Sequence, residues 1–163
     1  MRSLCPWLLC LCFCACAGGG RDFVPESRDV RVLDASATPE GAQGYEYVAR
    51  RPLALVALAE ARGIEPAMAR EATDRLADAL DACATDQGRK GSPVGGAARL
   101  VAAIEANGNV GTPIVRIDPA AGAAESAVMC LVAPARLLMF PPVDAGVRGI
   151  AIEALWGRLI PRR

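Results

Sequence analysis

Apolar residues in the first part of the chain recur at spacings typical of helices. Residues 53–62 follow a proline and precede Gly63, and these are the residues favoured at the start and just past the end of a helix. Because apolar positions cover most of the circumference of this predicted helix, we expect it to be buried or to dock on a partner. A second helix is predicted over 66–84, and its apolar face carries Met68, Ala72, Leu76, Leu80 and Cys83.

A β-hairpin is predicted next, from the alternation of apolar and polar residues. Its strands cover 97–105 and 109–118, and Asn107-Gly108 forms a tight turn between them, because both residues tolerate positive φ. Pro113 lies inside the second strand. It favours an edge position or a bulge, since proline has no N–H to donate to a ladder.

A helix and a closing strand complete the pattern. Helical spacing extends over 120–139, with Pro134 expected to kink or end the helix near residues 130–133. The last strand is predicted over 148–156; one face carries Ile150, Ile152, Ala154 and Trp156, and the other carries Ala151, Glu153 and Leu155. From residue 66 the order is helix, strand, strand, helix, strand. It predicts an α+β domain in which two helices cover a small antiparallel three-stranded sheet.

Residues 1–17 have the features of an export signal. A basic Arg2 precedes an apolar segment that is too short to span a bilayer, and small residues follow it. Two processing routes fit: removal of the leader after Ala17, or processing at a sequence that resembles a bacterial lipobox and ends in Cys16, which would then carry the lipid. We expect residues 18–48 to form a flexible linker, 49–157 the folded domain, and 158–163 a tail.

Five of the seven cysteines lie in the leader, which leaves Cys83 and Cys130 in the body. In an oxidising compartment, an even pair of this kind favours one disulfide. The alternative is two buried free thiols, because cysteine is among the most buried residue types.

Composition and charge exclude several classes of function. The chain has 163 residues, no histidine, and 18 basic residues balanced by 18 acidic ones. The balance disfavours nucleic-acid binding, and the lack of histidine removes the commonest general base and metal ligand. No phosphate-binding loop or paired-cysteine redox motif occurs, so no cofactor is expected. Asp74, Asp78 and Asp81 are interpreted as a solvent-facing stripe of a helix, and Arg99 and Arg116 as an exposed basic pair.

The body resembles the C-terminal domain of TonB, and more closely the AgmX/PglI-type C-terminal domain of myxobacterial envelope proteins. The likeness covers about residues 66–157. It depends on a cysteine in each of two helices, a tight turn at 105–110, Phe140-Pro141-Pro142 after the second helix, and a closing strand at 149–153. The resemblance implies that a partner could bind by adding a strand at an exposed sheet edge. The closing strand would then present Ala151, Glu153 and Leu155.

Together these observations predict a non-enzymatic envelope lipoprotein that acts as a protein-interaction or scaffold module. Its partner would be an envelope protein or a cell-wall component, and its lipid would hold it at the outer membrane, facing the periplasm or the surface. A soluble periplasmic or secreted protein is the alternative location. The alternative functions are a structural subunit that docks through the helix predicted at 53–62, and a thiol-dependent enzyme.

Overall fold

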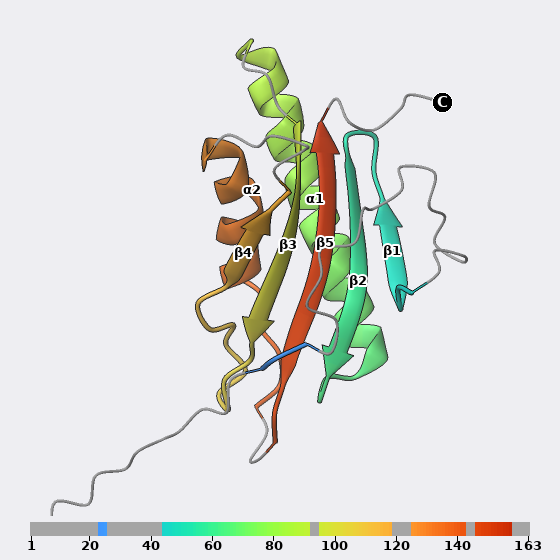
Figure 1. The fold of residues 1–163 in the computed structure, drawn as a ribbon, viewed down its shortest axis with the longest axis vertical. Helices are drawn as coiled ribbons and strands as arrows, with labels where there is room; N and C mark the ends of the chain where they lie inside the picture. The colour runs from blue at the N-terminus through green and yellow to red at the C-terminus, as the bar shows by residue number, and fades with distance from the viewer. Residues whose placement is uncertain (1–22, 26–43, 92–94, 119–124, 143–145, 158–163) are drawn as a thin grey trace, which may run out of the picture.

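The computed structural model describes residues 23–25, 44–91, 95–118, 125–142 and 146–157. The elements are β1 (Tyr47–Arg50), β2 (Ala54–Arg62), α1 (Pro66–Arg89), β3 (Gly95–Ala103), β4 (Ile114–Ile117), α2 (Glu125–Arg136) and β5 (Gly149–Gly157). They form an α+β fold in which both helices lie on the same face of one sheet (Figure 1). The α+β class predicted from the sequence is therefore confirmed.

The sheet has five strands in the order β1-β2-β5-β3-β4, and every neighbouring pair is antiparallel. The prediction of three strands was wrong because it missed the hairpin of β1 and β2. β1 begins at Tyr47, inside the segment that was expected to be linker. β5, the last strand in the sequence, lies at the centre of the sheet between β2 and β3.

The helix predicted at 53–62 is the strand β2. The backbone N–H of Arg51 donates to the carbonyl of Ala54, so Pro52 and Leu53 form the turn of a hairpin rather than the start of a helix. Residues Ala54 to Leu58 are all buried, because the two faces of the strand are both covered. A strand buried on both faces reads as a continuous apolar run, which resembles a buried helix in a sequence pattern.

The other predicted elements are present with shifted ends. α1 extends to Arg89, one turn and more beyond the predicted end, and β4 keeps only four residues of the longer predicted strand. Pro134 lies inside α2, which ends at Arg136 rather than before the proline. β4 is an edge strand, as Pro113 beside it indicated.

The main core lies between the sheet and the two helices. β5 contributes Ile150, Ile152, Ala154 and Trp156, all at most 1% exposed. The helices contribute Leu76 and Leu80 from α1 and Leu131 from α2, which are completely buried. A smaller apolar cluster covers part of the opposite face of the sheet; it consists of Val48, Leu55, Ala57 and Leu155.

Candidate interaction site

The three residues predicted for partner binding on the closing strand lie in the middle of the sheet. Ala151, Glu153 and Leu155 are 0%, 2% and 7% exposed, respectively. The backbone of β5 is paired on both sides, with β2 and with β3. Strand addition along β5 is therefore ruled out in this fold, and the prediction that β5 is an exposed edge was wrong.

A buried polar network explains the presence of an acidic residue on this central strand. Glu153 lies directly opposite Arg99 in the register of β3 and β5, and Arg99 Nη1 is 3.5 Å from Glu153 Oε1. The hydroxyl of Tyr45 donates to Glu153 Oε2 at 2.6 Å. Arg99 is only 2% exposed, so its interpretation as one half of an exposed basic pair was wrong. A buried charge is tolerated when an opposite charge and hydrogen bonds satisfy it.

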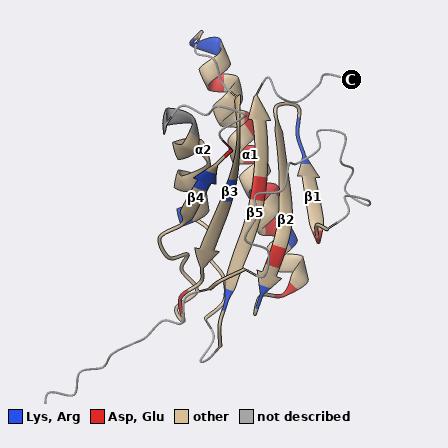
Figure 2. Ribbon diagram, in the orientation of Figure 1, with Lys and Arg blue, Asp and Glu red and all other residues tan. Residues whose placement is uncertain are grey.

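The aspartates of α1 hold the hairpin of β1 and β2 against the helix. Arg51 pairs with Asp74 at 3.1 Å and also with Asp78, and Asp81 Oδ1 accepts a hydrogen bond from the backbone N–H of Leu53. Hydrogen bonding from Arg51 lowers the pKa of Asp78, although desolvation opposes the shift. Figure 2 shows the acidic positions of α1 where the helix passes behind the sheet. The aspartates are therefore structural contacts rather than a purely solvated stripe.

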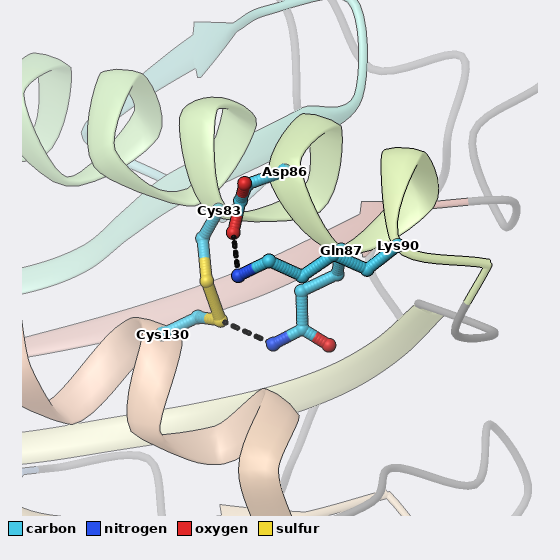
Figure 3. The surroundings of a disulfide bond; sticks show 5 residues. All are labelled: Cys83, Asp86, Gln87, Lys90 and Cys130. Atoms are coloured by element: carbon cyan, nitrogen blue, oxygen red, sulfur yellow. Dashed lines mark hydrogen bonds and ion pairs between the residues drawn. A yellow bond between two sulfur atoms is a disulfide. The ribbon is translucent and has the colours of Figure 1, made fainter.

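Cys83 of α1 and Cys130 of α2 form a disulfide across the two helices (Figure 3). Their Cα atoms are 6.0 Å apart, within the usual range for this bond. The side-chain amide of Gln87 lies 3.6 Å from the sulfur of Cys130, and Lys90 pairs with Asp86 at 2.7 Å beside it. Because both sulfur atoms are bonded to each other, neither is a thiol in this structure.

The two edges of the sheet differ in how far they are covered. On β1, Val48 and Ala49 would be poor contacts for a partner, because both positions are almost completely buried. The carbonyl of Arg50 accepts a hydrogen bond from the Arg51 side chain, so part of this edge is already occupied. On β4 the pattern is the reverse, since three of its four residues are exposed.

The backbone of β4 points alternate groups away from the sheet. The N–H of Asp118 donates to the carbonyl of Ala97 on β3 at 2.9 Å. Ladder hydrogen bonds alternate along an antiparallel pair, so Arg116 and Ile114 also bond to β3. The N–H and C=O groups of Val115 and Ile117 then face the outer edge. No described strand pairs with that edge.

Exposed apolar side chains occur on β4 and on α2, which contacts β4 at this edge of the sheet. Within the described part of the chain, six large apolar residues are exposed. Ile114 and Ile117 belong to β4, Met129 belongs to α2, and Leu137 and Met139 follow α2. The sixth, Val24, lines a pocket together with residues of β4. Figure 1 shows α2 alongside β4 at this side of the sheet. We call β4 together with Met129, Leu137 and Met139 the β4 edge.

The sequence pattern did not reveal the β4 edge as a candidate interaction site. Pro113 indicated an edge position, but the alternation over 109–118 gave no sign that only four residues would pair. Met129, Leu137 and Met139 lie within the helix predicted over 120–139, and none of them was identified as an exposed contact residue. The signal was the adjacency of Leu137 and Leu138, of which only Leu138 can face inward; it is 6% exposed and Leu137 is 80% exposed.

Comparison of the chain with protein-family models, with curated proteins and with solved structures finds no match. Neither helix in the described ranges combines the length and the apolar character needed to cross a membrane. In the same ranges, no group of three or more cysteine or acidic side chains is arranged to hold a metal ion. Cys16, the predicted lipidation site, lies outside the described residues.

Proposed function

We propose that this protein is a non-enzymatic envelope lipoprotein whose domain binds an extended segment of another envelope protein along the β4 edge. The observation that carries the proposal is the combination of an outer strand edge with exposed apolar side chains on β4 and on the neighbouring α2. A cell-wall component is the alternative ligand. The anchor would be a lipid on Cys16, at the outer membrane.

The edge supplies both parts of a strand-addition site. The outward N–H and C=O groups of Val115 and Ile117 would give main-chain hydrogen bonds to an extended partner. Side chains of an added strand alternate between the two faces of the sheet. On the helix side they would meet Val115, Ile117 and α2, so apolar partner residues are expected there. On the opposite side they would meet Ile114 and the basic Arg116.

The geometry disfavours the alternative of a structural subunit docked through residues 53–62. These residues form β2, which pairs with β1 on one side and with β5 on the other. Leu55, Val56 and Leu58 are at most 1% exposed, so they have no surface to offer a partner. The β4 edge is the more suitable surface for either a transient or a permanent partner.

A proline substitution tests the edge directly. In Val115→Pro, the outward N–H is lost while the hydrogen bonds of Ile114 and Arg116 to β3 stay in place. Val115→Ala is the matched control, because it shortens the side chain and keeps the N–H. Both variants are expected to melt as one folded species, and only the proline variant should lose partners that the wild type retains from cross-linked outer-membrane fractions.

Two outcomes of this experiment would contradict the proposal. A folded Val115→Pro domain that retains the same partners as the wild type would contradict strand addition at β4. Failure of the wild-type domain to retain any envelope component would contradict the interaction function itself. The anchoring is tested separately, since Cys16→Ser should move the protein out of the membrane fraction, and a mature N-terminus at Gly18 would refute lipidation.

A further inference from the structure

The side chain of Phe23 packs against the sheet, on the face that is turned away from the helices. It is only 6% exposed, whereas the neighbouring Val24 is 53% exposed. Figure 1 shows residues 23–25, in blue, crossing the lower part of the sheet. Phe23 is the only aromatic residue between the predicted leader and Tyr45, so it has the largest apolar side chain of this segment.

Gly149 on β5 provides the space for Phe23. The adjacent Ile150 lies in the core between the sheet and the helices, so position 149 faces the opposite side. The φ angle of Gly149 is not positive, so its backbone conformation suits any residue, and the glycine is needed for space. A Cβ atom there would overlap Cβ, Cγ and Cδ1 of Phe23. Because Cβ and Cγ lie at the base of the side chain, the ring could move aside only together with its backbone.

The guanidinium of Arg62, at the end of β2, lies over the Phe23 ring at 5.6 Å from its centroid. This distance is within the range of a cation–π interaction. Arg62 is the register partner of Gly149, and its Nη2 lies 2.6 Å from Glu60 Oε1 on the same strand. Phe23 therefore contacts residues of two neighbouring strands, β2 and β5.

We propose that residues 23–25 form a strap that holds the domain close to the membrane. This inference rests on the proposed function, because it takes a lipid on Cys16 as the anchor. Phe23 follows Cys16 by seven residues, and a chain of that length reaches at most about 25 Å. The next described residue, Gly44, follows Cys16 by 28 residues, which could extend to about 100 Å. Docking of Phe23 therefore shortens the maximum reach of the tether about fourfold.

Protection of Phe23 from chymotrypsin tests the docking in the purified full-length protein. The protease must bind this side chain before it cuts the bond that follows, so a buried Phe23 is cut only after it has left the sheet. Gly149→Ala should raise the rate of this cleavage by at least about tenfold, because the added methyl group displaces the ring. Arg62→Gln should raise it by about threefold, because the cation over the ring is lost.

Two controls separate release of the strap from loss of the fold. Gly88→Ala adds the same methyl group to α1, where it meets nothing within 4 Å outside its own helix, and should leave cleavage after Phe23 unchanged. Cleavage after Tyr47, in β1, reports opening of the domain and should stay slow in every variant. If Gly149→Ala does not fold, Arg62→Gln provides the test. Rapid cleavage after Phe23 in the wild type, or equal rates in the wild type and these two variants, would refute the docking.

Insertion of about ten Gly and Ser residues tests the distance to the membrane, since it raises the root-mean-square length of the tether to Phe23 from about 15 Å to about 23 Å. The lipid-bearing protein is reconstituted in phosphatidylethanolamine/phosphatidylglycerol vesicles that contain an acceptor-labelled lipid, with a donor dye on Asn107→Cys. An insertion after Gly20 lies between the lipid and the strap, so it should lower energy transfer. The same insertion after Arg31 lies beyond the strap. It should leave transfer unchanged in the wild-type background and lower it in Gly149→Ala.

The outcomes distinguish the strap from the anchor. An equal loss of transfer from the two insertions would refute the strap, and so would unchanged transfer with both, because the distance would not depend on the tether. Protein that does not stay on the vesicles would contradict the lipid anchor of the proposed function and, with it, the distance limit. Protection of Phe23 from chymotrypsin does not depend on the lipid. Val115→Pro should leave both measurements unchanged, so failure of strand addition at β4 is also distinguishable.

Discussion

Reduction of the disulfide between Cys83 and Cys130 should lower the stability of the domain substantially. The bond closes a loop of 47 residues. Chain-entropy arithmetic for a loop of that length gives a stabilisation of about 4 kcal/mol, which is an upper value because reduced chains retain some structure. For a domain of about this size, 1 kcal/mol corresponds to roughly 4–8 °C in melting temperature. The predicted decrease is therefore roughly 15 °C or more at the upper value.

The structure also indicates which element should loosen first. α2 has 12 residues and contains Pro134, and a helix of that length is marginal in water without its packing. Its buried apolar side chains are Cys130, Leu131 and Ala135. α1 is twice as long and packs along β2 and β5. After reduction, α2 should lose protection of its amides before β5 does.

The assay combines melting curves with hydrogen exchange on the oxidised protein, the reduced protein and the double variant Cys83→Ala/Cys130→Ala. The double variant controls for effects of the reductant and should match the reduced wild type. Two results would refute the reasoning. One is quantitative alkylation of both thiols in unfolded protein without reductant. The other is a melting temperature that changes by less than about 3 °C on complete reduction, which is below 1 kcal/mol.

Two further predictions concern packing and charge. Leu131→Ala should destabilise the domain by about 2–5 kcal/mol in chemical denaturation, because Leu131 is 0% exposed. Met129→Ala should change the stability by less than about 0.5 kcal/mol, because Met129 is 52% exposed. Equal losses of stability in the two variants would refute the orientation of α2. Asp78→Asn should cost less than about 1 kcal/mol at pH 7, because the ion pair with Arg51 is largely exposed. The pKa of Asp78 is lowered in the folded state, so this stability is present above its ordinary pKa of 3.8 and is lost as the pH falls through the lower folded-state value. Wild type and Asp78→Asn should therefore converge in acid-unfolding curves, and a gap that widens on acidification would contradict the pairing.

The sequence predicted the elements whose apolar spacing is local. α1 has a clear apolar face, and Leu76 and Leu80 on that face are completely buried. The tight turn at Asn107-Gly108 is also present, with Gly108 at φ +88° and its N–H bonded to the carbonyl of Glu105. Because these features depend on neighbouring residues alone, the local pattern of the sequence was sufficient to predict them.

The hairpin of β1 and β2 could not be predicted in the same way. β2 is rich in alanine and buried on both faces over its first five residues, so it shows no alternation. Alanine also favours helices, which supported the wrong interpretation. The position of β5 depends on pairing with residues about 50 and 95 positions earlier in the chain, as Arg99↔Glu153 and Ala57↔Glu153 show. Local spacing contains no information on such register.

The same long-range pairing determines which strands lie at the edges of the sheet, and therefore where the candidate site lies. Glu153 reads as a solvent-facing residue on an amphipathic strand until Arg99 and Tyr45 are placed beside it. Once β5 occupies the centre, the remaining edges are β1 and β4, and only β4 is mostly exposed. The proposed interaction surface is therefore β4, which the sequence pattern described poorly, and not β5, which it described well.

Amide hydrogen exchange at Val115 and Ile117 tests strand addition at β4 most directly. The measurement compares the free domain with its complex with whichever envelope partner the wild type retains. The N–H groups of these two residues face the outer edge, so they should exchange rapidly in the free domain and slow by at least about tenfold in the complex, while Ile114 and Arg116 change little. Unchanged exchange at Val115 and Ile117 in a saturated complex would contradict strand addition at this edge.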